Sequence, residues 1–228
     1  MKGRLTISIL LLFVFGCKHS ETILSELNYG MIAPEIAAKE WIENEGADEV
    51  VLYDFIRSIN SETQQLQNAY AFIDNAENKI KYNANIRLKT KLAISKGHLL
   101  LKMNKVDSVI DLLQGISFSN TEISFLWKML YHSTLGNAYY MNSNEEKANE
   151  HYLMGYELAL FNSNSEYTVL FSVNLGAIAY ANGDLDRSTH FFLQAYAANK
   201  DSKIVNKTLN NNLASSLIDD GRYERALE

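Results

Sequence analysis

The sequence predicts an all-α fold in which antiparallel helix hairpins stack into a solenoid. The 228 residues include a single proline and 11 glycines, so few positions interrupt a helix. Apolar residues recur at intervals of three and four in several segments, which is the helical period. A set of small and apolar residues also returns with a period of about 40 residues, and a period of this length is typical of helical repeat arrays.

Residues 1–16 are predicted to be a signal peptide. Lys2 and Arg4 precede an apolar run from Leu5 to Phe15, which is too short to span a bilayer comfortably. The run ends at Gly16, immediately before Cys17.

The stretch Val14-Phe15-Gly16-Cys17 resembles the lipobox of bacterial lipoproteins, although Phe15 stands where a smaller residue is usual. The resemblance implies cleavage before Cys17 and acylation of that residue, so that its lipid attaches the protein to a membrane. Lys18, which follows, resembles the pattern that sorts Gram-negative lipoproteins to the outer membrane. The run Cys-Lys-His-Ser-Glu is loosely similar to the tails of surface lipoproteins in Bacteroidetes-type bacteria. The implied location is the cell envelope, with the protein facing the periplasm or the outside.

Two alternatives to the lipoprotein stay open. The protein could be an ordinary secreted protein with an unmodified thiol, or it could keep the hydrophobic segment as an anchor. Cys17 is the only cysteine of the chain. An intramolecular disulfide and a thiolate metal cluster are therefore excluded whether or not the protein is a lipoprotein.

The charge of the chain argues against a nucleic-acid partner for this segment. The formal net charge is −6, and loss of Lys2 and Arg4 with the signal peptide would leave 19 basic against 27 acidic residues. Such a surface repels nucleic acid and anionic lipid headgroups.

Residues 17–49 are predicted to form a linker and a capping helix. Ile23–Glu45 has a helical pattern interrupted near Pro34, with Trp41 and Ile42 available to pack on the first hairpin. A terminal repeat otherwise exposes an apolar face, which is why a cap is expected there.

Residues 50–228 are predicted to be helical repeats. The clearest copy has Leu175-Gly176 as its anchor, and Leu135-Gly136, Lys96-Gly97 and Leu213-Ala214 are the equivalent pairs. The last copy stops inside its second helix, so we expect the natural protein to be longer or this reading frame to be a truncated relative. The copies occupy about 50–89, 90–128, 129–168, 169–206 and 207–228.

Each copy is expected to be one hairpin. In the clearest copy Gly183 can take a positive φ at the turn, and Asp184 can cap the second helix. Small residues such as Gly176 and Ser188 allow the helices to approach closely, and Phe192 fills the gap that they leave.

The pattern resembles the tetratricopeptide repeat. The copy at 129–168 has Leu135, Gly136, Tyr139, Ala148 and Tyr152 at the positions of that motif. Its closing proline is absent from every copy, and the spacing exceeds the usual repeat of about 34 residues. The insertions FNSNSEYTV and NKDSKIVN are therefore expected to extend the second helices or to lengthen the turns. The resemblance implies a right-handed α-solenoid.

The resemblance also implies a concave face, lined by the first helix of each copy, that binds a protein or peptide partner. Asparagine, tyrosine and methionine side chains suit contacts with a peptide backbone and its side chains. The alternative is that these positions form only the solvated inner wall. The predicted inward residues are Ser133, Asn137, Tyr140, Met141, Val173, Ala177, Tyr180, Asn211 and Ser215.

No pattern of catalytic or metal-binding residues is present in the sequence. The five histidines lack the spacing of a metal-binding helix, and they are expected to lie partly exposed beside the core. No Gly-rich phosphate loop or Gly-x-Ser-x-Gly motif occurs, and acid pairs such as Asp219-Asp220 are explained by solvated helix starts. We therefore predict a protein that is not an enzyme and has no cofactor and no metal.

The predicted function is that of a lipid-anchored interaction scaffold of the bacterial cell envelope. The alternative is that these repeats form the N-terminal sensor half of a longer transcriptional regulator or signalling kinase. The sequence leaves the identity of the partner and the oligomeric state open.

Overall fold

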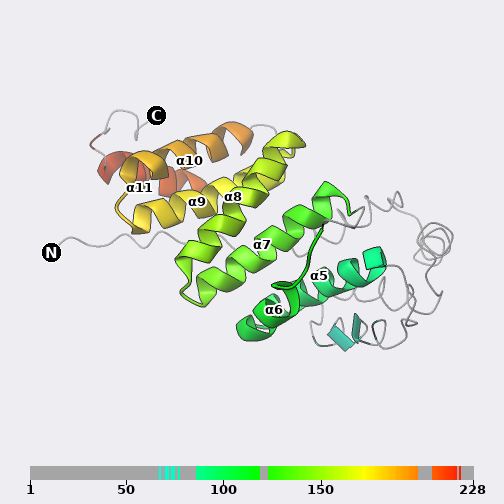
Figure 1. Ribbon diagram of the computed structural model, residues 1–228. Helices are drawn as coiled ribbons and strands as arrows, with labels where there is room; N and C mark the ends of the chain where they lie inside the picture. Colours follow the sequence, from blue (N-terminus) through cyan, green and yellow to red (C-terminus); the bar gives the residue numbers. More distant parts are fainter. Residues whose placement is uncertain are drawn as a thin grey trace. The chain divides into compact units, whose positions relative to one another are not determined.

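The computed structural model describes residues 86–118, 123–199, 207–219 and 221, together with six isolated positions between residues 67 and 77. The signal peptide, Cys17, the capping segment and nearly all of the copy at 50–89 lie outside the described residues. The part that the structure describes is helical and contains no strand, which confirms the all-α prediction (Figure 1). Its helices are α5 (Ile86–Lys102), α6 (Val106–Leu113), α7 (Phe125–Met141), α8 (Glu145–Phe161), α9 (Ser165–Ala181), α10 (Leu185–Asn199) and α11 (Lys207–Asp219).

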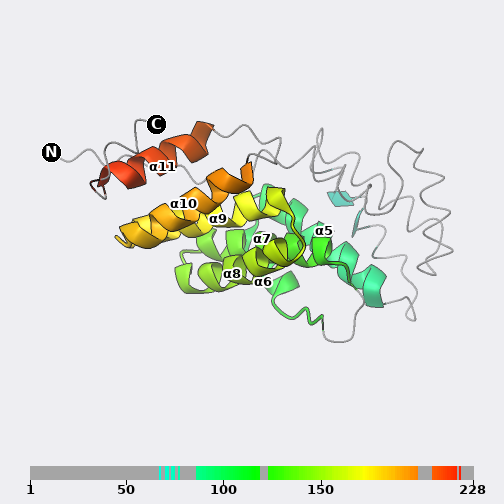
Figure 2. The ribbon, with the colours of Figure 1, turned by 90° about the horizontal axis from the view of Figure 1, so that it is seen from above.

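The chain divides into two compact units on either side of the junction between Asn142 and Ser143. The N-terminal unit contains α5, α6 and α7, and each of these helices packs on the other two. The C-terminal unit contains α8, α9, α10 and α11. Each of its helices packs on the next one along the chain (Figure 2). Helix α9 also contacts α11. Packing of neighbouring helices in succession is compatible with an α-solenoid.

The described helices explain the length of the period. Four successive helices begin at equal intervals along the chain, at Phe125, Glu145, Ser165 and Leu185. The first three of these helices have 17 residues each, and a short turn follows each of them. A pair of helices with its two turns therefore extends from Phe125 to the start of α9, and this length matches the period of the sequence repeat.

The insertion FNSNSEYTV takes part in this regular spacing. Phe161 is the last residue of α8, Asn162–Asn164 forms the turn, and Ser165 begins α9. The expected longer turn is therefore not found. The residues from Ser165 onward belong to α9, the first helix of the next copy, and only Phe161 belongs to the second helix that was expected to be extended. Most of the second insertion, NKDSKIVN, lies outside the described residues.

The turn at Asn182-Gly183-Asp184 has the predicted geometry. Gly183 adopts a φ of 78°, and its N–H donates to the carbonyl of Tyr180 while the N–H of Asp184 donates to that of Ala179 at 2.9 Å. This is the Schellman arrangement that ends a helix. The carboxylate of Asp184 then accepts the N–H of Arg187 at 3.1 Å and caps α10.

The backbone repeats this conformation at the positions that the sequence aligns as turns. Asn104, Ser143, Gly183 and Gly221 have φ values of 58°, 57°, 78° and 76°. Ser163, in the turn between α8 and α9, has a φ of 51°. The turn positions of four sequence copies therefore share one backbone conformation, although two of them are not glycine.

Small residues bring the helices together in the core. A Cβ added to Gly176 would lie 2.7 Å from the ring of Phe192, and one added to Gly97 would lie 2.6 Å from Leu113. Because real Cβ atoms do not approach this closely, both sites require glycine or a shift of the packing. The predicted packing of Phe192 against Gly176 is confirmed.

Candidate functional site

The predicted binding residues of the C-terminal unit differ in accessibility. Val173 is only 3% exposed and belongs to a core cluster that includes Phe192 of α10 and Leu209 of α11. Ala177 and Ser215 are also buried. Tyr180 is half-buried and Asn211 is exposed. Packing within the unit buries Val173, Ala177 and Ser215. Tyr180 and Asn211 are therefore the members of this set that solvent reaches.

The predicted residues of the N-terminal unit all lie on α7. Ser133 and Asn137 are buried, Tyr140 is half-buried, and Met141 is exposed. The accessible members are thus the last two residues of the helix. On α9, the accessible predicted residue likewise lies at the C-terminal end of the helix, since Tyr180 is its penultimate residue.

A hydrogen bond links α9 to α11 in the C-terminal unit. The hydroxyl of Tyr180 donates to the carboxylate of Asp219, which is exposed and is the last residue of α11. This hydrogen bond and partial burial raise the pKa of Tyr180 to about 12. The prediction that a solvated helix start explains Asp219 is wrong, since this residue ends a helix and has a partner 39 positions away.

One position of the repeat carries a buried polar side chain in each of four helices. It is the residue before the anchor pair, which is Asn174 on α9, Asn212 on α11, Ser95 on α5 and Thr134 on α7. Within the described structure, each of these side chains has a buried polar atom without a hydrogen-bond partner, and in both asparagines this atom is Nδ2. A buried donor without an acceptor costs about 1–3 kcal/mol, so such a group is expected to have a reason for its place.

Sequence reasoning missed these four residues. They precede the anchor by one position and belong neither to the anchor nor to the predicted inward positions. Their shared repeat position and polar character could have singled them out. Their burial, at 2% exposure for Asn174 and 3% for Asn212, could not have been read from the sequence.

The contact between α10 and α11 is partly polar. The hydroxyl groups of Thr189 and Ser216 lie 2.8 Å apart, and Ser216 donates to Ser188 at 3.2 Å. All three side chains are buried. Because these hydroxyl groups satisfy one another, they hold α11 in register against α10 without needing a ligand.

Lys96 of the N-terminal unit has a structural explanation. It occupies the anchor position at which other copies have leucine, and its ammonium group donates to Asp74 at 2.8 Å and to Glu77. Burial lowers the pKa of Lys96, but the hydrogen bonds to Asp74 and Glu77 raise it by more, so it lies above its ordinary value. The ion pairs therefore allow a charged side chain at a core position.

The exposure of the described histidines varies more than the sequence predicts. His98 and His132 are buried, which differs from the expected partial exposure, whereas His151 is half-buried and His190 is exposed. Burial and the nearby charge of Lys147 lower the pKa of His151 to about 4. No group of three or more His, Cys, Asp or Glu side chains that could hold a metal ion occurs in the described part of the chain.

The helices that the structure describes include none with both the length and the apolar character needed to cross a membrane. In comparisons with known proteins, no protein-family model and no curated protein matches this chain.

Proposed function

We propose that this chain is a tetratricopeptide-like interaction scaffold that binds an extended polypeptide segment across α9 and α11. The observation that carries the proposal is the pair Asn174 and Asn212, whose buried side-chain N–H groups have no acceptor. The two residues hold the same repeat position on helices that pack together. A polypeptide backbone offers carbonyl acceptors at regular intervals, which matches donors repeated along a stack of helices. Because both amide groups are buried in the unbound chain, the polypeptide must displace the side chains that cover them in order to pair with them.

The regular hairpins support the solenoid part of the proposal. Helices that start at equal intervals and turn positions with positive φ in four copies are compatible with a stack of hairpins. The right-handed sense of the stack, and a face lined by the first helix of each hairpin, are proposed from the resemblance to the tetratricopeptide repeat. Tyr180 of α9 and Asn211 of α11 are the predicted binding residues of the C-terminal unit that remain accessible.

The lipid anchor is a separate part of the proposal and rests on the sequence alone. Cys17 and the residues before it resemble a lipobox, from which we propose that the scaffold is attached to the bacterial envelope, in the outer membrane. Radioactive palmitate fed to cells should label the wild-type protein and not a Cys17→Ala variant. Equal labelling of the variant would contradict the anchor without touching the binding proposal.

Selection from a library of random twelve-residue peptides, displayed on phage and presented to the full chain, tests the binding function. We expect peptides to be enriched and to bind the double variant Asn174→Leu, Asn212→Leu at least tenfold more weakly. The variant should keep its melting temperature, because replacing a buried amide that has no partner by an apolar group of similar size is close to neutral or stabilising.

Asn149→Leu, on α8, is the matched control. Its side chain lies 3.5 Å from Arg187 and outside the α9–α11 pair. Failure to enrich any peptide, or equal affinity of both variants for the enriched peptides, would contradict the proposed site.

A further inference from the structure

The Tyr180–Asp219 pair offers two features to a ligand at the same place. Tyr180 presents an aromatic ring that is half-buried, and Asp219 presents an exposed carboxylate that accepts the hydroxyl of Tyr180. An ionised carboxylate has about four acceptor positions, and one hydrogen bond from Tyr180 leaves room for another donor. The hydrogen bond also holds the carboxylate beside the ring.

The segment after Asn142 carries most of the negative charge of the protein. Residues 143–228 contain 12 acidic and 7 basic residues, so −5 of the formal charge of −6 belongs to this part of the chain. A surface with this imbalance attracts cations and repels anions.

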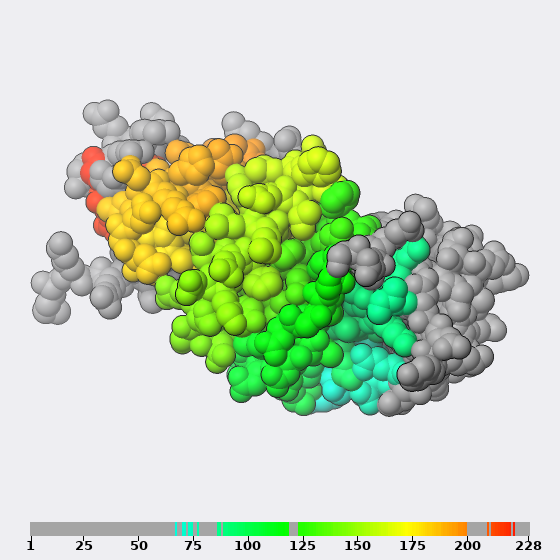
Figure 3. Space-filling model, in the orientation of Figure 1, coloured from blue at the N-terminus to red at the C-terminus, as the bar shows by residue number. Residues whose placement is uncertain are grey.

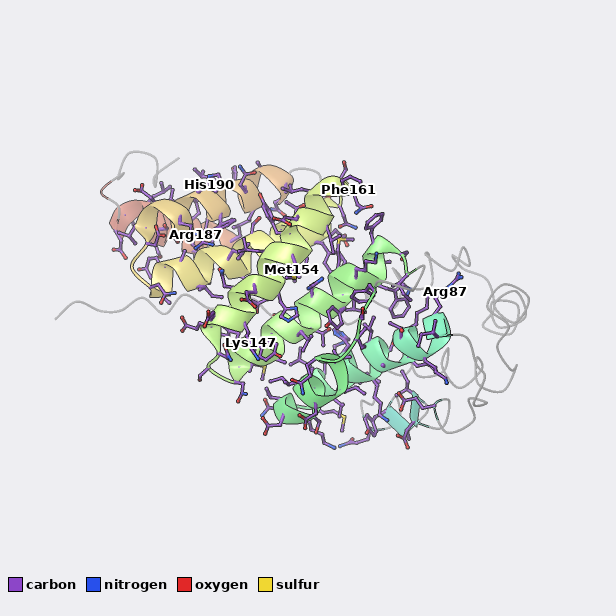
Figure 4. All side chains as sticks on the ribbon, in the orientation of Figure 1. Arg87, Lys147, Met154, Phe161, Arg187 and His190 are labelled. Atoms are coloured by element: carbon purple, nitrogen blue, oxygen red, sulfur yellow. The ribbon has the colours of Figure 1, made fainter. Side chains whose placement is uncertain are left out.

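Lys147 belongs to α8 and Arg187 to α10 (Figure 4). Tyr180 belongs to α9 and Asp219 to α11. Arg187 lies 3.5 Å from Asn149 of α8, and its guanidinium lies 5.6 Å from the ring centre of Phe191. Side chains of α8, α9 and α10 cover the side of this unit seen in Figure 3, and α11 is visible only at its edge. Arg187 is therefore engaged with α8 and with its own helix rather than with Asp219.

We infer that the Tyr180–Asp219 pair receives a positively charged side chain, arginine or lysine, of the polypeptide that binds across α9 and α11. The cation forms an ion pair with Asp219 and lies against the ring of Tyr180, where the π electrons attract it. An acidic or phosphorylated segment would meet a carboxylate in a negatively charged unit and is disfavoured. The inference rests on the proposed function, since it names the chemistry of the partner at that site.

Two labelled peptides of equal length test the inference, acetyl-(Gly-Ser-Arg)₄-amide and acetyl-(Gly-Ser-Glu)₄-amide, titrated with the full-length protein in a fluorescence anisotropy experiment. We expect the arginine peptide to bind, and the glutamate peptide to bind at least tenfold more weakly. Asp219→Asn should weaken binding of the arginine peptide by about fivefold, which is the effect of one exposed ion pair.

Two more variants separate the local contact from the general charge. Glu157→Gln removes the same charge from the exposed surface of α8 and should weaken binding less than twofold. Tyr180→Phe keeps the ring and should lower the affinity slightly, whereas Tyr180→Ala should lower it by about another fivefold. Equal losses in Asp219→Asn and Glu157→Gln would overturn the inference, because they would reduce it to a general charge effect.

The outcomes also separate this inference from the function on which it rests. Binding of the glutamate peptide, or enrichment of peptides without basic residues in the library selection, would overturn the inference and leave the scaffold in place. If neither labelled peptide bound and the library gave no binder, the proposed function and the inference would both fail.

Discussion

Gly176 of α9 lies directly against the aromatic ring of Phe192 of α10, and a Cβ at position 176 would stand 2.7 Å from it. Phe192 is fully buried and belongs to the helix that follows Gly176 in the same hairpin. Leu113 stands in the same relation to Gly97 in the N-terminal unit, with a distance of 2.6 Å. The hairpin therefore depends on a glycine in one helix and a large apolar side chain in the other.

Gly176→Ala should destabilise the protein because the new methyl group forces Phe192 or a helix to move. Overpacking of a close-packed core costs about 1–3 kcal/mol, which urea denaturation can measure from the shift of the midpoint. Gly115→Ala is the matched control, since a Cβ there meets nothing within 4 Å. If Gly176→Ala lost less than about 0.5 kcal/mol, as ordinary surface substitutions do, the contact would not be tight.

Ser143→Gly and Ser163→Gly should each stabilise the protein. Both serines have a positive φ, and this left-handed conformation costs a residue with a Cβ about 1–2 kcal/mol. Glycine avoids that cost, but it has more conformational freedom in the unfolded chain, which offsets part of the gain. We expect a gain of about 0.5–1 kcal/mol for each in thermal or urea unfolding.

Ser108→Gly provides the opposite control for these turns. Ser108 is exposed within α6, where glycine in a helix interior costs about 0.5–1 kcal/mol. If all three substitutions changed stability in the same direction, the turn conformation of Ser143 and Ser163 would be contradicted.

The Tyr180–Asp219 hydrogen bond should appear in an alkaline titration. The near-ultraviolet absorbance of tyrosinate reports all 13 tyrosines, so the difference between the wild type and Tyr180→Phe isolates one of them. We expect this difference to titrate with a pKa of about 12. In Asp219→Asn the pKa of Tyr180 should fall toward its ordinary value near 10, because the asparagine lacks the negative charge that opposes ionisation.

Ionisation of Tyr180 is expected to destabilise the folded protein at high pH. The folded-state pKa of Tyr180 lies above the unfolded one, so its contribution is fully present below pH 10 and is lost as the pH rises to about 12. A difference titration with a midpoint near 10 would contradict the hydrogen bond.

His151 should make the protein less stable in mild acid. Its folded-state pKa is about 4 because burial and Lys147 oppose the charged form, while the unfolded pKa is near 6.5. Between these values the unfolded chain binds more protons, so stability falls as the pH decreases from 6.5 to 4. Since the side chain is only half-buried, we expect the effect to be about 1 kcal/mol.

His151→Gln checks this pH dependence. The difference in unfolding free energy between pH 7 and pH 5, measured by urea denaturation, should be smaller in the variant than in the wild type. An identical difference in both proteins would mean that His151 is protonated as easily in the folded state as in the unfolded chain.

The local structure of the hairpin could be predicted from the sequence because short-range rules determine it. Gly183 supplies a positive φ, Asp184 accepts a backbone N–H from its own helix, and Phe192 follows Gly176 at a fixed spacing. The helical period and the chemistry of turns are properties of a few adjacent residues. The all-α class follows from the same rules.

The candidate site depends on which helix faces are covered, and only the tertiary structure decided that. The helical period places Val173, Ala177 and Tyr180 near one another on α9, but packing buries the first two and leaves the third accessible. The partner of Tyr180 is 39 residues away on another helix, and the unpartnered amides of Asn174 and Asn212 depend on the absence of an acceptor in the surrounding packing. Periodicity states which residues share a face, whereas burial and hydrogen bonding depend on what other helices place against that face.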